Sequence, residues 1–455
     1  MHPEFSVLKN KLSLIGEEHL LKYWDTLAEI SRTALATQIQ NLDFSTILTQ
    51  KKLLQIPSTK TPLSFEPFQN CEKSGNLKLK QMGEELLTEG KVGCLVIAGG
   101  QGTRLNLDGP KGTYPISIIK HKSLFQLLAE KAQAVAKQTG KTPSLAIMTS
   151  PLNHEQTLTF FRQHRNFGLA QENISFYTQE MLPFLNQQGT LFLEKPDQIA
   201  MGPNGNGRSL ASFFHSGIWE EWSERGIKYL NYVLIDNPLA DPFDAELIGR
   251  HASSESDITI KCIRRQTIDE KVGILVTHEG KAKVIEYTEF PQPEKEALRS
   301  DGTFRHPYAN ISLFCFSMDF IRQMALSDEI FPLHANLKTA SEISLTNGKV
   351  STQKIEAWKF ETFIFDLLPY ANHLEILVYP REECFSPLKN EKGEASPASV
   401  KAALQAQDRK ILADITHLSP PDFPFELSQE FHYPTHQLLD KWHTRQPDAN
   451  SYIEP

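Results

Sequence analysis

A short apolar run that ends in three closely spaced glycines restricts the fold of this chain more than any other stretch. The run Cys94–Ala98 is long enough for a buried parallel strand and too short for a buried helix. Gly99, Gly100 and Gly102 follow it directly. Glycines at such a place let the main chain approach a ligand closely, so that its N–H groups can converge on phosphate oxygens. The stretch therefore predicts a strand followed by a phosphate-binding loop.

Two cations, Arg104 and Lys111, follow in the same loop and would lie beside an anion held by its amides. The alternative is a tight turn with two solvated cations, because short glycine patterns are common. A dinucleotide-binding fingerprint would need glycine where Leu105 stands. The spacing of a P-loop does not occur near this loop either. Neither of these two phosphate-binding motifs therefore explains the stretch.

The sequence Gly-Gly-Gln-Gly-Thr-Arg-Leu of residues 99–105, followed by Pro-Lys-Gly at 110–112, resembles the signature of the sugar-nucleotide pyrophosphorylases. Within them it is most similar to the eukaryotic-type UDP-N-acetylhexosamine pyrophosphorylases. Further segments that resemble the family occur in family order between about residues 18 and 390. The resemblance implies an enzyme that makes a UDP-sugar and pyrophosphate from UTP and a sugar 1-phosphate.

The resemblance also implies which residues bind the nucleotide. They are Ala98, Gly99, Gly100, Gly102, Thr103, Gln179 and Gly205. Gln179 lies in the segment Tyr177–Pro183, whose glutamine reads the uracil edge in the family. A side-chain amide suits that task because it offers both a donor and an acceptor. Without the resemblance, a glutamine in a loop would be interpreted as solvated.

A second set of residues is implied for the sugar and for catalysis. The predicted substrate-binding residues are Asn206, Gly273, Glu286, Asn310, Phe363 and Lys389, and the predicted catalytic residues are Arg104, Lys111 and Lys389. Asp236 follows the apolar strand Tyr229–Ile235, at the strand end where ligands bind in open α/β sheets. A carboxylate there suits Mg²⁺, which takes oxygen ligands from one or two acids and from phosphates. A turn or helix-capping aspartate is the alternative.

Two departures from the family pattern concern the choice of sugar. Asn106 replaces an expected glycine, and the residues around Asn310 differ from the family segment. N-acetylglucosamine 1-phosphate is the favoured acceptor, and glucose 1-phosphate is the alternative. A sensor that binds the sugar nucleotide without turnover is a further alternative. A nicotinamide-dependent oxidoreductase is disfavoured by the missing fingerprint glycine.

The composition limits the partners and the compartment. A formal charge of −8 over 455 residues argues against broad binding to nucleic acid or to an anionic membrane. No window of about 18 apolar residues predicts a membrane span. Five widely separated cysteines without a Cys-x-x-Cys pair predict reduced thiols in a cytoplasmic protein. We expect a monomer or a homodimer.

The pattern along the chain predicts three regions. Residues 1–85 are expected to be mainly helical, 86–390 to form the catalytic domain and 391–455 to form a small C-terminal lobe. Strands alternating with helices predict a Rossmann-like, mostly parallel α/β sheet flanked by helices. Ser123 and Gly140 predict the start and the end of one of these helices. An apolar stripe from Leu20 through Trp24 to Leu35 predicts one helix that runs to about Ile39. The prolines of residues 56–68 predict a linker. Residues 257–287 are expected to form a small sheet, whose last two strands are joined as a hairpin through Glu279 and Gly280.

Overall fold

The computed structural model describes residues 3–55, 65–69, 71–327, 331–346, 349–445 and 451–455. The chain divides into two compact units, which are described separately. Unit 1 comprises Met1–Leu63, Glu180–Arg208 and Ile330–Phe363. Unit 2 comprises Ser64–Gln179, Ser209–Glu329 and Ile364–Pro455. The predicted catalytic domain thus contributes chain to both units, and its predicted boundaries stay a prediction.

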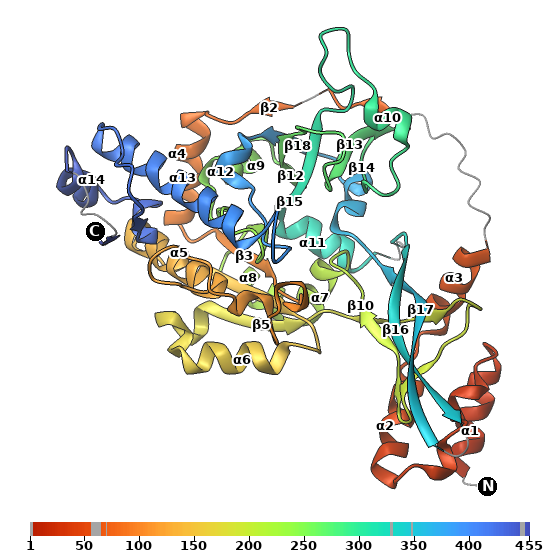
Figure 1. Cartoon of the computed structure of the whole chain (residues 1–455). Helices are drawn as coiled ribbons and strands as arrows, with labels where there is room; N and C mark the ends of the chain where they lie inside the picture. Colours follow the sequence, from red (N-terminus) through yellow and green to blue (C-terminus); the bar gives the residue numbers. More distant parts are fainter. Residues whose placement is uncertain (1–2, 56–64, 70, 328–330, 347–348, 446–450) are drawn as a thin grey trace. The chain divides into compact units, whose positions relative to one another are not determined.

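Unit 2 is built around a central sheet (Figure 1). The strand order along it is β2-β18-β12-β15-β11-β3-β4-β5. These strands are β2 (Glu72–Lys73), β18 (Leu374–Val378), β12 (Ile258–Arg264), β15 (Tyr308–Ser317), β11 (Tyr229–Leu234), β3 (Val92–Ile97), β4 (Ser144–Thr149) and β5 (Ile174–Thr178). Neighbours are parallel except at β15, which is antiparallel to both β12 and β11. The predicted mostly parallel α/β sheet is confirmed.

The expectation of a small sheet over residues 257–287 is wrong, because all three strands belong to the central sheet of unit 2. β12 lies inside the central sheet between β18 and β15. β13 (Gly273–His278) and β14 (Lys281–Ile285) form the predicted hairpin, and β13 pairs with β15 and with β1 (Glu66–Pro67). Every residue of β12 except the last is buried. The strand therefore needs cover on both faces, which a central position in the sheet provides. β1 lies in the predicted linker of residues 56–68, of which residues 56–64 lie outside the described residues.

Helices flank this sheet (Figure 1). They are α4 (Leu77–Thr88), α5 (Leu124–Thr139), α6 (His154–Gln163), α7 (Ser209–His215), α8 (Ile218–Glu224), α9 (Ala245–Ser253), α10 (Gln292–Glu296), α11 (Met318–Ala325) and α12 (Arg381–Cys384). α5 starts and stops where the sequence predicts: the Ser123 hydroxyl accepts from the Gln126 N–H, and Gly140 closes the helix with φ 78°. Its apolar face packs into the main core with β3 and β4.

The last part of the chain packs on the rest of unit 2 and also has a core of its own. It contains α13 (Pro397–Thr416), β19 (Glu426–Leu427), α14 (His436–Trp442) and β20 (Tyr452–Ile453). Phe425, Phe431 and Trp442 belong to the local core, whereas Val400 and Tyr433 belong to the main core. A Glu426 carboxylate oxygen accepts from the N–H groups of Ile119 and Lys120, which ties β19 to the segment before α5.

Unit 1 combines helices with a long β-hairpin. Its helices are α1 (Pro3–Ser13), α2 (Glu29–Gln40) and α3 (Phe44–Gln55). Its strands are β6 (Met181–Pro183), β7 (Leu185–Asn186), β8 (Leu193–Lys195), β9 (Gln198–Ile199), β10 (Met201–Pro203), β16 (His334–Thr346) and β17 (Lys349–Glu361). β16 and β17 pair along their whole length, and β17 also pairs with β7. The helices and strands share one apolar core.

The prediction of one helix through Leu20 and Trp24 to Ile39 is wrong. Two 3-10 turns, Glu18–Leu21 and Trp24–Thr26, precede α2, and the backbone is extended at Leu27 and Ala28. The apolar stripe is accordingly broken, since Ile30 is 85% exposed. The apolar spacing arose from two short turns and a helix that bury different faces. No helix among the described residues has the length and hydropathy needed to cross a membrane.

Candidate functional site

The glycine-rich loop leaves the carboxyl end of β3, as predicted. The Ala98 N–H donates to the Met148 carbonyl at 2.8 Å, and the Gly102 N–H donates to the Gly109 carbonyl at 3.0 Å. The carbonyl of Gly100 accepts from the Lys111 N–H at 3.1 Å. The loop is therefore folded back on itself. Within the described part of the chain, the N–H groups of Gly99 and Gly100 have no acceptor, so these two amides are available to a phosphate.

Asn153 holds this loop in place, a role that the sequence did not reveal. Its side chain is 1% exposed, and its Nδ2 donates to the carbonyls of Ala98 at 3.0 Å and Gly100 at 3.3 Å. Its Oδ1 accepts from the Ser150 N–H. An asparagine directly before a helix is typical of an N-cap, but this side chain caps nothing in α6. It fixes the loop carbonyls, and with them the direction of the neighbouring amides.

Gln179 lies directly against the loop. Its main-chain N–H donates to the Thr149 carbonyl at the end of β4, and its side chain is buried. A Cβ added to Gly99 would stand 2.1 Å from the Gln179 Nε2. The absence of a side chain at Gly99 therefore makes room for the amide that is predicted to read uracil. The structure brings these two predicted nucleotide-binding residues together.

Lys111 and Asp236 form an ion pair in unit 2. Lys111 belongs to the 3-10 turn Lys111–Thr113, and Asp236 follows β11, the neighbour of β3 in the sheet. The Lys111 Nζ lies 3.3 Å from the Asp236 Oδ2, and each side chain is 13% exposed. The other oxygen, Oδ1, is buried and has no hydrogen-bond partner among the described residues. A buried carboxylate oxygen without a donor is an uncommon arrangement, and a cation would satisfy it.

This donor set fits a magnesium ion in part. Mg²⁺ is commonly bound by one or two carboxylates together with substrate phosphates and water, and Asp236 offers one such oxygen. No cluster of three or more histidine, cysteine or acidic side chains suited to a metal occurs within the described ranges. The residues therefore suit an ion that is held partly by the substrate rather than by a complete protein cage.

The segment that carries Lys389 lies beside Asp236. The Leu388 N–H donates to the Asp236 carbonyl at 2.7 Å, and the Lys389 N–H donates to the Ala395 carbonyl. The structure thus brings together the loop of Gly100, the ion pair of Lys111 and the backbone next to Lys389. Arg104 and Thr103 lie on the 3-10 turn Thr103–Leu105 of the same loop, with exposed side chains.

Three of the predicted substrate-binding residues of unit 2 gather around the start of β13. Gly273 pairs with Asn310 of β15, and a Cβ on Gly273 would stand 3.7 Å from the Glu286 Oε1. Asn310 is 5% exposed, and its Oδ1 accepts from the Ser312 N–H. Gly273, Glu286 and Asn310 therefore form one group.

The remaining predicted residues, Gly205, Asn206 and Phe363, belong to unit 1. Gly205 has φ 79° and forms a bridge with Thr362, and the Gly207 N–H donates to the Thr362 carbonyl. Asn204 is 4% exposed, and its Oδ1 accepts from the Thr362 hydroxyl. Within this unit the glycine-rich turn thus lies against the segment of Phe363. Their contacts with substrate stay predictions.

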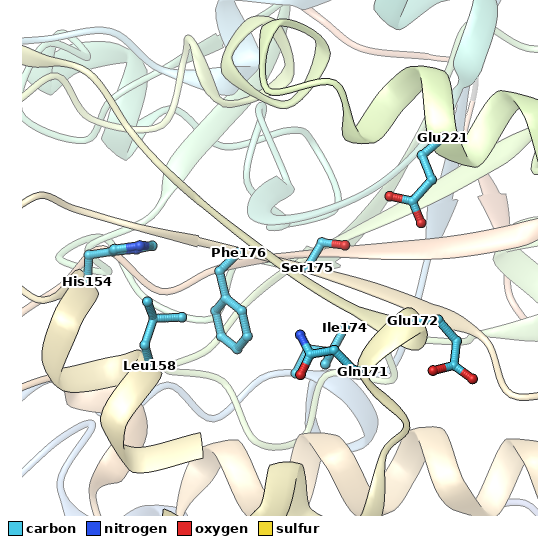
Figure 2. Close-up of a pocket in the computed structure, with 8 residues that line it drawn as sticks. All are labelled: His154, Leu158, Gln171, Glu172, Ile174, Ser175, Phe176 and Glu221. Carbon is cyan, nitrogen blue, oxygen red and sulfur yellow. The ribbon is translucent and has the colours of Figure 1, made fainter. Parts of the chain in front are cut away.

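A separate hollow of about 640 Å³ lies along the edge strand β5 (Figure 2). Its lining residues are His154, Leu158, Gln171, Glu172, Ile174, Ser175, Phe176 and Glu221. It contains none of the predicted site residues, and the ionised side chains on its rim, Glu172 and Glu221, would repel a phosphate. This hollow is not a candidate nucleotide site.

Comparisons with known proteins identify the family of this chain. Residues 44–393 match the family model described as UTP–glucose-1-phosphate uridylyltransferase. The chain belongs to this family. UDP-N-acetylglucosamine diphosphorylase 2 of Arabidopsis thaliana is 31% identical over 447 residues, which cover 91% of this chain and 86% of the relative. UDP-N-acetylhexosamine pyrophosphorylase-like protein 1 of Homo sapiens is 30% identical over 427 residues, covering 88% and 84%.

Solved structures of uridylyltransferase-family proteins share the fold. The structure of a putative UDP-N-acetylglucosamine pyrophosphorylase from Entamoeba histolytica is 26% identical with a TM-score of 0.76, covering 86% of this chain and all of that one. The UDP-N-acetylglucosamine pyrophosphorylase of Trypanosoma brucei, 23% identical, has a TM-score of 0.78 over 100% of this chain and 99% of that one. The predicted family, fold and nucleotidyltransferase class are confirmed, and the oxidoreductase alternative is set aside.

Proposed function

We propose that the protein transfers a uridylyl group from UTP to N-acetylglucosamine 1-phosphate, making UDP-N-acetylglucosamine and pyrophosphate. The observation that carries this proposal is the Lys111–Asp236 pair, which adjoins the glycine-rich loop through Gly100 and the Lys389 segment through Leu388. It would supply one cation, Lys111, and one metal ligand, Asp236, between the loop that holds the triphosphate and the lysine that holds the acceptor phosphate. The choice of sugar is supported by the names of the relatives that align with most of this chain.

The reaction requires two anions to be held in line. An oxygen of the sugar 1-phosphate would form a bond to the α-phosphorus of UTP, while the bond from that phosphorus to the bridging oxygen of the β-phosphate breaks and pyrophosphate leaves. No protein nucleophile or proton transfer is needed, because the attacking phosphate is already an anion. The work of the protein is therefore positioning and neutralisation of charge, which together can contribute several kcal/mol.

We assign roles in this scheme to the predicted residues of unit 2 that surround the phosphates and the sugar. The free amides of Gly99 and Gly100 would hold phosphate oxygens, and Gln179 would hydrogen-bond the uracil edge. Arg104 and Lys111 would neutralise the triphosphate and the leaving pyrophosphate, and Lys389 would hold the acceptor phosphate. Asp236 would hold Mg²⁺, which supplies further charge neutralisation to the phosphates when bound. Gly273, Glu286 and Asn310 would contact the sugar hydroxyl groups.

Glucose 1-phosphate is the second candidate acceptor. It is favoured by the description of the matching family model, which names a UTP–glucose-1-phosphate uridylyltransferase. The altered surroundings of Asn310 also concern the sugar directly, because this residue is paired with Gly273. The two candidates share every step at the phosphates and differ only in the group at the sugar C2 position.

Release of pyrophosphate from UTP tests the proposal. The purified protein with Mg²⁺ is supplied in turn with the 1-phosphates of N-acetylglucosamine, N-acetylgalactosamine and glucose, and kcat/KM is compared. We expect the highest value with N-acetylglucosamine 1-phosphate. A higher value with glucose 1-phosphate would replace the proposed acceptor, and no release with any of the three would contradict the proposed reaction. Omission of the sugar phosphate controls for hydrolysis of UTP.

We also propose a cytoplasmic protein that is a monomer or a homodimer. The five cysteines, all free, support a reducing compartment. Light scattering of the purified protein measures the oligomeric state, and microscopy of the tagged protein measures the compartment.

A further inference from the structure

A buried asparagine, Asn237, links the end of β11 to the segment that carries Lys389. It directly follows Asp236 and is 4% exposed. Its Nδ2 donates to the Cys384 carbonyl at 2.8 Å, and its Oδ1 accepts from the Ser386 N–H at 3.0 Å. Both ends of the amide are therefore used, one as donor and one as acceptor. No other side chain of similar size offers both groups in this arrangement.

The main chain adds a third link between the same two segments. The Leu388 N–H donates to the Asp236 carbonyl at 2.7 Å. Residues 384–388 are thus attached to Asp236 and Asn237 at three points, and Lys389 is the next residue. Leu388 itself is fully buried, which anchors the segment further. The path from the carboxylate of Asp236 to the backbone of Lys389 is consequently short and fixed.

We propose that Asn237 is a positioning residue that fixes Lys389 relative to Asp236. This inference rests on the proposed function, in which Asp236 serves the triphosphate and Lys389 the acceptor phosphate. A reaction between two bound anions depends on their separation, and a misplacement of about 1 Å can cost about 100-fold in rate. Asn237 acts on the chemistry only through Lys389, because its own polar atoms are occupied by the protein backbone.

The removal of this link has a specific kinetic consequence. In Asn237→Ala the Leu388 bond remains, so the segment stays near the sheet but loses two of its three attachments. We expect kcat/KM for the sugar 1-phosphate to fall about ten-fold, with the KM for UTP changed less than about two-fold. The N–H of Ser386 should exchange faster with deuterium, because it loses its acceptor.

A double-mutant cycle separates positioning from a structural role. Asn237→Ala is made alone, Lys389→Ala alone, and both together. If Asn237 acts through Lys389, the asparagine substitution should cost less than about two-fold in the variant that lacks the lysine. Equal costs in both backgrounds would overturn the inference. Unfolding midpoints of all variants are measured alongside, and Asn237→Ser, which leaves a smaller void, replaces the alanine variant if the latter does not fold.

Asn231 provides a matched control. It lies on β11, the strand that precedes Asn237, is 1% exposed, and donates from its Nδ2 to the Pro242 carbonyl at 3.1 Å. Asn231→Ala removes a comparable buried bond without touching the Lys389 segment. Its cost in activity should be the same with and without Lys389, and hydrogen exchange at residues 384–388 should be unchanged. A coupling free energy between Asn231→Ala and Lys389→Ala as large as that between Asn237→Ala and Lys389→Ala would contradict the inference.

The inference and the proposed function fail in different ways. If the wild-type protein forms no UDP-sugar from any sugar phosphate, the proposed function is wrong. If the wild-type protein is active but Asn237→Ala changes the kinetics with UTP and with the sugar phosphate equally, the positioning role of Asn237 is wrong and the proposed function stands.

Discussion

The Lys111 Nζ lies 3.3 Å from the Asp236 Oδ2, and the other oxygen of the same carboxylate is buried without a partner in the described part of the chain. The two residues are separated by 125 positions in sequence. Their meeting follows from the parallel pairing of β3 with β11, because the segments after both strands start at the same edge of the sheet. Lys111 therefore pairs with the Oδ2 of Asp236 and leaves its Oδ1 for a second cation.

Asp236→Asn tests the proposed metal ligand. The amide has nearly the shape of the carboxylate but lacks its charge, so the fold should persist while the affinity for a divalent ion falls. We expect turnover to fall on the order of 100-fold. Binding of Mn²⁺, followed by electron paramagnetic resonance, should weaken in parallel. Normal Mn²⁺ affinity together with normal turnover would remove Asp236 from the site.

Arg104→Ala tests the exposed arginine of the glycine-rich loop. Its side chain projects from the 3-10 turn Thr103–Leu105 and is exposed, so its removal should hardly change the free energy of unfolding. We expect turnover to fall at least about ten-fold, because a charge-assisted contact to the phosphates is lost. Arg162→Ala, at another exposed arginine, is the control. Near-normal turnover of Arg104→Ala would refute its role.

Gly99→Ala tests the contact between the loop and Gln179. An added Cβ would stand 2.1 Å from the Gln179 Nε2, so the amide must move. We expect the KM for UTP to rise at least about ten-fold and the preference for UTP over CTP to fall, since the uracil edge loses its reader. Gly100→Ala is matched for stability, because a Cβ there meets nothing within 4 Å. An unchanged KM in Gly99→Ala would show that Gln179 does not contact the base.

The sequence predicted the parts of this site that have local signals. The strand before Gly99, the caps of α5 at Ser123 and Gly140, and the strand before Asp236 each follow from patterns within a few residues. The resemblance added residues such as Gln179 and Lys389 that have no local signal. Local patterns failed at Leu20–Ile39, where two turns imitate one helix.

The supporting residues could not be predicted. Asn153 and Asn237 act through backbone carbonyls far away in sequence, and the sequence around each suggests only a cap or a turn. The position of β12 inside the sheet likewise depends on pairing with β15 and β18, which no pattern in residues 257–287 specifies. Long-range hydrogen bonds of this kind decide the geometry of a site, but not its composition.

His251 should make the stability of the protein depend on acid pH. Its ring is fully buried in α9 against Thr259, and burial lowers its pKa from 6.5 to about 3. Below about pH 6.5 the unfolded chain binds a proton at this position, whereas the folded protein does not until about pH 3. A falling pH therefore favours unfolding, and His251 alone should cost about 2 kcal/mol of unfolding free energy between pH 7 and pH 5.

His251→Gln tests this contribution. The glutamine keeps a partner for the Thr259 hydroxyl and cannot titrate, so urea unfolding should show a loss of stability between pH 7 and pH 5 that is smaller than in the wild type by about that amount. His436→Gln, the same substitution at an exposed histidine, is the control for the exchange of histidine for glutamine. Equal pH dependence of His251→Gln and the wild type would mean that the buried ring is protonated in the folded protein.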